Sequence, residues 1–138
     1  MNMIEFGRDI LNRQSFSRLL GAELLAFEPG RAELRLSLRD DLKQQHGFAH
    51  GGLIAYLADN ALTFAGGSAL GGEAVVSQEM KINYIRPGIG AALIARAETL
   101  STGTSQAVVR CDVFALADDG SEKLCAAAQG TIVRLAKG

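Results

Sequence analysis

One stretch constrains the fold of this chain more than any other: residues 51–72 carry a single charge, Asp59. Within it, residues 52–66 are apolar nearly all round a helix, a pattern typical of a buried helix. Both histidines of the chain, His46 and His50, stand just before this segment. A lone carboxylate in such surroundings must be desolvated, paired or functional. We therefore expect the chemistry of the protein near Asp59.

Alternating apolar and polar residues predict strands on both sides of that helix. Residues 31–38 alternate most cleanly, with Ala32, Leu34, Leu36 and Leu38 on the buried face. The predicted strands cover residues 22–27, 31–38, 75–86, 91–100, 104–116 and 123–135. A short helix over residues 3–20 and a polar loop over residues 39–50 precede the buried helix.

This order of elements predicts an α+β fold in which one long helix is buried against a curved antiparallel sheet. Small residues on the helix allow the sheet to approach it closely, namely Ala55, Ala58, Ala61, Ala65 and Gly66. No linker or internal repeat interrupts the chain, and its 138 residues are the size of one domain. We expect a single domain over residues 1–138, with its core at about 22–135 and a short N-terminal helix.

Charge and composition limit the class of function. The chain has 14 Lys and Arg against 15 Asp and Glu with no charged run, so we expect neither nucleic acid nor a membrane surface as partner. Residues 51–72 contain six glycines and Asp59 and are a poor membrane span. The N-terminus lacks a signal-peptide pattern, which favours a cytoplasmic protein. Cys111 and Cys125 lie in apolar segments without metal-ligand spacing, so we expect buried free thiols and no metal site.

The pair Gly51-Gly52 is a candidate start for the buried helix. The first amide N–H groups of a helix have no partner within it, and glycine lets a ligand approach them. The helix dipole adds partial positive charge at this end, so the arrangement can polarise a carbonyl or hold an oxyanion. The alternative is a glycine-rich turn that only starts a helix.

Asp59 follows Gly51 by eight residues, which separates the two by roughly 12 Å along one helix. One carbonyl cannot touch both within one chain. Acyl transfer would therefore need a second copy of the chain lying antiparallel, in a two-fold dimer with shared sites. The alternative for Asp59 is a structural hydrogen bond to Thr63, one turn away.

Three nearby polar residues leave similar choices open. Thr63 can hold a water beside the carboxylate or bond its own backbone. His50 can contact a substrate carbonyl or serve as a structural residue at the helix start. Gln44 can orient a water or a carbonyl, or be an ordinary surface residue.

Taken together, these residues resemble the hot-dog fold thioesterases of the PaaI-like (phenylacetic acid degradation) family. The resemblance covers about residues 30–135 and rests on His50-Gly51-Gly52, on Asp59 nine residues after the histidine, and on the Met-Lys-Ile-Asn-Tyr-Ile-Arg-Pro run of residues 80–87. It implies a helix wrapped by an antiparallel sheet, paired into homodimers that often form tetramers. It also implies hydrolysis of acyl-CoA thioesters without a metal or cofactor, coenzyme A being part of the substrate.

The resemblance assigns roles around the buried helix by position. Asp59 corresponds to the catalytic carboxylate, as general base or nucleophile. Gly51 corresponds to the backbone N–H that polarises the thioester carbonyl, with His50 in support. Gln44 lies six residues before that histidine, where family members carry Asn or Gln, and Thr63 lies where some relatives use Thr or Ser near the attacking water.

Residues of the strand after the helix receive further roles. Ser77 matches a position used in some family members. Strand parity places it on the face opposite to Met80, so it needs a β-bulge to reach the helix side. Arg86 and Lys81 are candidate partners for the phosphates of coenzyme A, or ordinary surface charges of the strand.

Two other functions stay open at this point. An acyl-thioester dehydratase or hydratase of the same fold would use His50 and Asp59 together on its substrate. A non-catalytic acyl-CoA-binding module would bind the same ligand without turnover.

Overall fold

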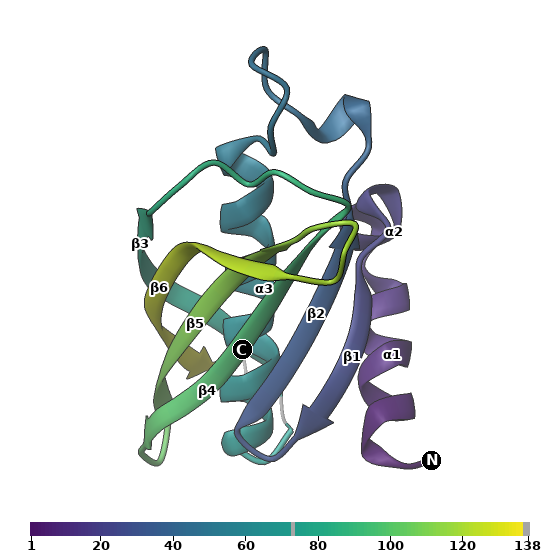
Figure 1. The fold of residues 1–138 in the computed structure, drawn as a ribbon. Coiled ribbons are helices and arrows are strands. Elements are labelled where there is room, and N and C mark those ends of the chain that lie inside the picture. Colours follow the sequence, from purple (N-terminus) through teal and green to yellow (C-terminus); the bar gives the residue numbers. More distant parts are fainter. Residues whose placement is uncertain (73, 137–138) are drawn as a thin grey trace.

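The computed structural model describes residues 1–72 and 74–136, in which one long helix lies against a six-stranded sheet (Figure 1). The elements are α1 (Met3–Arg13), α2 (Ser15–Leu20), β1 (Glu23–Glu28), β2 (Arg31–Ser37), the 3-10 helix η1 (Asp40–Leu42), α3 (Gly51–Ala69), β3 (Val75–Tyr84), β4 (Ala92–Thr102), β5 (Gln106–Leu116) and β6 (Glu122–Arg134). The strands pair antiparallel in the order β1-β2-β4-β5-β6-β3. The predicted α+β hot-dog fold is confirmed.

Small residues let α3 pack closely on the sheet. Ala58, Ala61 and Ala65 are fully buried. A Cβ atom at Gly66 would stand 2.6 Å from Cγ1 of Ile132, so only glycine fits where the helix meets β6. The predicted close approach is therefore confirmed, although Ala55 is only half-buried and lines a cavity.

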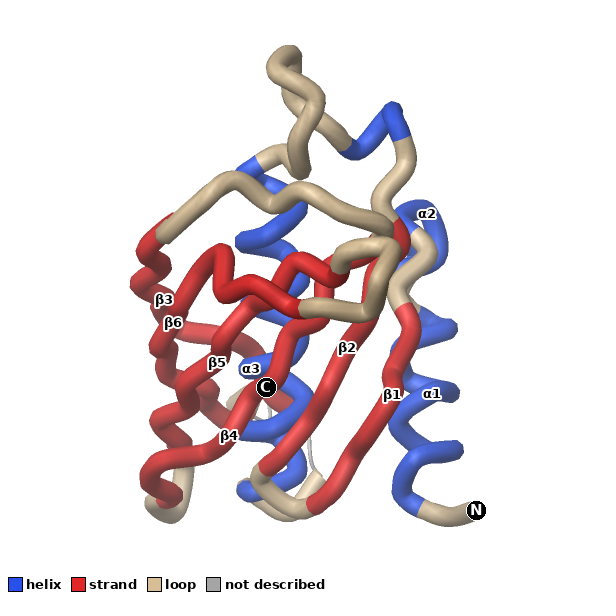
Figure 2. Tube along the Cα trace, viewed as in Figure 1, coloured by secondary structure: helices blue, strands red, loops and turns tan. Residues whose placement is uncertain are grey.

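The N-terminal segment forms two helices where the sequence predicted one over residues 3–20. Gln14 breaks the helix, with φ and ψ of −85° and 105°. Its side-chain Oε1 accepts hydrogen bonds from Ser17 Oγ at 2.6 Å and from Asn60 Nδ2 at 3.2 Å. These side-chain bonds replace helical ones that the break removes. Both helices lie beside β1, at the sheet edge farthest from β3 (Figure 2).

Several predicted boundaries shift by a few residues. The strand β2 ends at Ser37, so Leu38 lies just beyond it and is half-buried. The helix α3 runs on past residue 66 to Ala69, because the glycines there fit beneath β3 and β6. The predicted loop at residues 39–50 contains η1 and projects beyond the end of the sheet (Figure 1).

The strand β3 is an edge of the sheet and pairs with β6 alone. Its register with β6 shifts between Ser77 and Glu79, which is a β-bulge. Before the bulge Val75 and Ser77 are the more buried residues, and after it Met80 and Ile82 are. Ser77 therefore faces α3 together with Met80, as it could not in an unbroken strand of the same length.

Candidate active site

His50 and two glycines build the start of α3. His50 is the N-cap residue, and its Nδ1 accepts a hydrogen bond from the Gly52 N–H at 2.8 Å. Its carbonyl accepts from the N–H groups of Leu53 at 3.0 Å and Ile54 at 3.2 Å. Within the described part of the chain, no group accepts a hydrogen bond from the Gly51 N–H. Gly51 thus holds the free donor of the first turn, and His50 serves as a helix-start residue.

The peptide between Gly51 and Gly52 is held at both ends. Its N–H donates to His50, and its carbonyl accepts a hydrogen bond from Tyr84 Oη at 3.2 Å. The Tyr84 ring also stands 3.6 Å from the position a Cβ atom at Gly51 would take. Sequence reasoning missed Tyr84, because the signal is tertiary: the end of β3 passes the start of α3.

Asp59 lies two turns further along α3, at a cavity of about 300 Å³ between that helix and β3. Its Oδ1 is buried, and no described residue donates a hydrogen bond to it. Thr63 does not serve it, because the Thr63 hydroxyl donates to the backbone carbonyl of Asp59 at 2.8 Å. A structural bond between the two side chains, one of the alternatives from sequence, is therefore wrong. Its Oδ1 is therefore an acceptor without a partner, in a residue that lines this cavity.

Three polar residues of β3 line the same cavity, namely Ser77, Gln78 and Glu79. The bulge brings Ser77 to its β3 wall, together with Glu79. Glu79 is already bonded, since its Oε1 accepts from Thr131 Oγ1 at 2.9 Å. A buried oxygen left without a partner costs about 1–3 kcal/mol and is uncommon in folded proteins. Asp59 thus differs from the neighbouring carboxylate in a way that indicates function.

Three other predicted site residues meet at a second cavity, of about 350 Å³, at the start of α3. They are Gln44, Gly51 and Arg86. The side-chain oxygen of Gln44 accepts a hydrogen bond from the His46 backbone N–H, which fixes the amide in its loop. Lys81 is exposed on the opposite face of β3 from Met80 and lines none of the cavities described for the chain.

The predicted site residues therefore fall into separate groups within one chain. Asp59 and Ser77 share one cavity, while Gly51, Gln44 and Arg86 share another. Gly51 and Asp59 lie on one unbroken helix, so their separation of roughly 12 Å stands. None of the four cavities described in residues 1–72 and 74–136 is lined by both Gly51 and Asp59.

A buried polar network lies beside the Asp59 cavity and joins α2 to α3. The Tyr56 and Ser17 hydroxyls share a hydrogen bond of 2.6 Å. Asn60 Nδ2 donates to Tyr56 Oη at 3.0 Å and to Gln14 Oε1 at 3.2 Å. Burial raises the pKa of the Tyr56 phenol above its ordinary value of 10.0. Sequence reasoning missed this network because Gln14 and Asn60 are 46 residues apart.

The two cysteines are free and buried, as predicted. Burial raises the pKa of Cys111 to about 12 and that of Cys125 to about 11, so neither is a thiolate near neutral pH. Among residues 1–72 and 74–136 no three His, Cys, Asp or Glu side chains gather to hold a metal ion. No helix in those ranges is long and apolar enough to cross a membrane.

Several of the known proteins that this chain is similar to are named as thioesterases. A family model described as the thioesterase superfamily matches residues 46–121. A thioesterase family protein of solved structure from Silicibacter pomeroyi is 34% identical, with a TM-score of 0.89 over 94% of this chain and 96% of that one. A mutant of the phenylacetic acid degradation protein PaaI from Thermus thermophilus is 32% identical, with a TM-score of 0.74 over 87% and 98%. Human acyl-coenzyme A thioesterase 13 is 30% identical over 102 residues, 72% of this chain and 73% of that protein.

Proposed function

The chain belongs to the thioesterase superfamily, and from this premise we propose that it hydrolyses acyl-CoA thioesters to a free acid and coenzyme A. The human relative is named an acyl-coenzyme A thioesterase, and the proposed substrate class follows that name. One observation in the chain itself supports the proposal most: Asp59 lines a cavity, and its buried Oδ1 has no partner among the described residues. A carboxylate in that state is suited to take a proton from water or to attack a carbonyl.

A homodimer is part of the proposal. Asp59 and the Gly51 N–H are roughly 12 Å apart on one helix, so a second copy lying antiparallel is needed to bring one of each together. Two features support such pairing. The ten-residue strand β3 is paired on one side only within the described sheet, and α3 leaves a half-buried stripe at Ala55, Tyr56 and Asp59. A dimer of two such dimers is the larger assembly that the family resemblance implies.

The proposed reaction uses both subunits. The thioester carbonyl oxygen accepts a hydrogen bond from the Gly51 N–H, and the helix dipole stabilises the negative charge that develops there. Asp59 of the partner subunit takes a proton from water, whose oxygen attacks the carbonyl carbon. Direct attack by that carboxylate, giving an anhydride that water then opens, is the other form of the step. The carbon–sulfur bond breaks, and coenzyme A leaves as the thiolate.

The other predicted residues take supporting roles. Ser77 lines the Asp59 cavity and is the better placed residue to orient the attacking water. The Thr63 hydroxyl donates to the Asp59 carbonyl, so its role is to accept a hydrogen bond from that water. His50 fixes the helix start, and Gln44 shapes the loop beside it. Arg86 lines the same cavity as Gly51, so it is better placed than Lys81 to bind the phosphates of coenzyme A. Lys81 is a second candidate from the opposite face of β3.

Thiol release from a panel of aryl, short and long acyl-CoAs tests this function. Asp59→Asn should lower the rate at least about a hundredfold, the usual scale for loss of a general base. Glu79→Gln is the matched control, because that carboxylate lines the same cavity but already has a partner, and it should stay within about threefold.

Other results of that assay would overturn the proposal. Full activity in Asp59→Asn would remove the proposed role of the carboxylate. Water addition to an enoyl-CoA, without thiol release, would make the protein a hydratase. Acyl-CoA binding without turnover would make it a binding module.

A further inference from the structure

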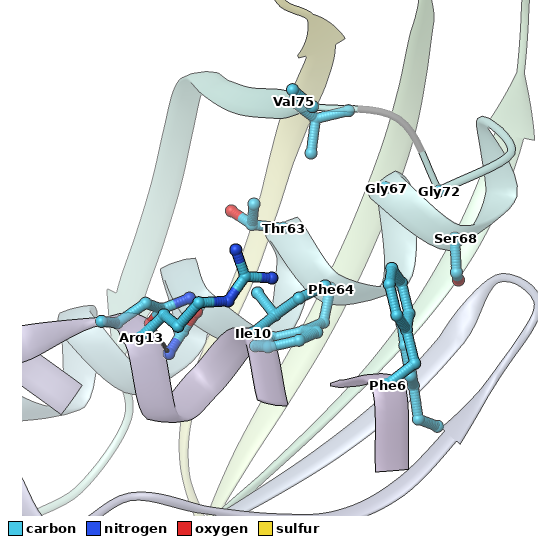
Figure 3. A pocket seen from close by; sticks show the side chains of 13 residues that line it. Phe6, Ile10, Arg13, Thr63, Phe64, Gly67, Ser68, Gly72 and Val75 are labelled. Atoms are coloured by element: carbon cyan, nitrogen blue, oxygen red, sulfur yellow. Dashed lines mark hydrogen bonds between the residues drawn. The ribbon is translucent and has the colours of Figure 1, made fainter. Parts of the chain in front are cut away.

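A cavity of about 370 Å³ lies between α1, the C-terminal half of α3 and the start of β3. Figure 3 shows Phe6 and Ile10 entering it from α1, Phe64 from α3, and Val75 pointing into it from β3. Phe27 of β1 closes the wall behind Phe64, with ring centroids 5.4 Å apart in an edge-to-face contact. The walls are thus mainly apolar and come from four elements.

This cavity is the next one along α3 and β3 after that of Asp59. Thr63, one turn beyond Asp59, lies on its wall, and residues four apart on a helix have Cβ atoms about 5–6 Å apart. On the strand side Val75 precedes Ser77 by two residues and shares its face. The two cavities are thus neighbours along α3 and β3, and a group bound at Asp59 would reach this one by extending one helical turn along α3.

The polar side chains that line the cavity already have hydrogen-bond or ion-pair partners. Gln14 and Asn60 bond to each other and to Ser17. Arg13 also lines the cavity; its guanidinium pairs with Asp9 at 3.3 Å and its side chain is 69% exposed, so its charge stays hydrated. An apolar group can enter without removing water from an unpaired buried charge.

We propose that this cavity binds the acyl group of the substrate, and that the protein favours apolar acyl groups of medium length or with an aryl ring over acetyl. The inference rests on the proposed function and names the substrate class of the same site. An engineered apolar cavity of about 150 Å³ takes a benzene ring, so this one has room for an aryl group or a medium chain. An acetyl group would leave it unfilled.

Chain length is the first test, with kcat/KM measured for acetyl-, butyryl-, hexanoyl-, octanoyl- and palmitoyl-CoA. Each methylene that enters the cavity should raise kcat/KM by about fourfold, which corresponds to about 0.8 kcal/mol. The rise should end once the cavity is full, before palmitoyl-CoA. A flat series, or one that is highest for acetyl-CoA, overturns the inference.

A matched pair of variants locates the effect. Val75→Phe places a ring in the cavity and should lower kcat/KM for octanoyl-CoA at least about tenfold, with acetyl-CoA changed less than about twofold. Val76→Phe is the control, because Val76 is the neighbouring residue, 42% exposed on the other face of β3. Equal effects of the two variants, or equal loss on both substrates, contradict the assignment.

A second variant, Phe6→Ala, tests the same cavity if Val75→Phe does not fold. Phe6→Ala removes a half-exposed ring from the wall and should shift the preferred chain to a longer one, whereas Leu19→Ala on α2 should not. These outcomes are separate from the function itself. Thiol release with no dependence on Val75 or Phe6 sinks this inference alone, and absence of thiol release from every acyl-CoA sinks the proposed function.

Discussion

Tyr84, the last residue of β3, donates a hydrogen bond to the carbonyl of Gly51, the first residue of α3, at 3.2 Å. The same peptide donates its N–H to His50. Two residues thus hold the start of the helix. Tyr84 is 33 positions from Gly51 in sequence, and His50 is adjacent to it. The orientation of the free Gly51 N–H depends on both contacts.

Tyr84→Phe removes the hydroxyl and keeps the ring against Gly51. A hydrogen bond of this kind contributes about 0.5–1.5 kcal/mol, so we expect kcat to fall by about threefold to tenfold while KM stays near its original value. Steady-state kinetics with one acyl-CoA measure this split. A raised KM with unchanged kcat would show that Tyr84 only binds substrate.

Tyr56→Phe is the contrasting variant at the other tyrosine. It strips a buried hydrogen bond from Ser17 and Asn60, so it should lower the free energy of unfolding by about 1–3 kcal/mol. Urea unfolding measures the loss. An unchanged stability would mean that water replaces the phenol hydroxyl in the network.

Gly51→Pro tests the proposed N–H donor directly. Proline is well tolerated at the first position of a helix, and the backbone of His50, at φ −62° and ψ 137°, suits a residue before proline. The substitution replaces the N–H hydrogen with a ring methylene, and kcat should fall about a hundredfold or more. Gly51→Ala is the control, since its Cβ would meet Tyr84 at an ordinary 3.6 Å and the N–H is kept. Equal activity of the two variants would exclude the N–H from the reaction.

Mixing two inactive chains tests the shared site. Asp59→Asn retains the Gly51 N–H, and Gly51→Pro retains the carboxylate. Random pairing makes about half of the dimers mixed, each with one intact site, so co-refolding should restore roughly a quarter of the original activity. A mixture as inactive as its parts would place each site within a single chain.

The buried thiols predict an alkaline loss of stability. The pKa of Cys111 is raised from 9.0 to about 12, so below pH 9 the thiol is protonated whether the chain is folded or not. As the pH rises above 9, only the unfolded thiol ionises, and the free energy of unfolding falls. Urea unfolding at about pH 8 and about pH 10.5 should show a larger drop in the original protein than in Cys111→Ala. An equal drop would mean that the thiol opens to solvent in the folded state.

The sequence was sufficient for the fold wherever one face of an element is buried. The change from a helical period to strict alternation after residue 72 predicted the buried helix and the strands that follow it, and both are confirmed. The break at Gln14 was beyond the sequence, because the partners of its side chain include Asn60, which only the fold brings near.

The candidate site was predictable in its residue types and less so in its contacts. The isolation of Asp59 in an apolar segment pointed to it, and its Oδ1 is indeed buried without a described partner. The Thr63 hydroxyl, by contrast, turns to the helix backbone, since that acceptor lies one turn away in any helix. Tyr84 belongs to the run of residues 80–87 that the resemblance uses, but nothing in the sequence indicated its hydrogen bond to Gly51.

The bulge in β3 has a consequence for changes of chain length. It lets odd-numbered residues before it and even-numbered residues after it face the same way. Loss of Gln78 would leave Ser77 and Met80 two positions apart, so both would still face α3 in a strand that pairs without interruption. Loss of Lys81 would instead make Met80 and Ile82 adjacent, and one of them would turn outward. Related chains whose β3 is one residue longer or shorter should therefore carry the insertion or deletion at the bulge. At that position the change leaves Ser77 and the apolar residues of the strand facing α3.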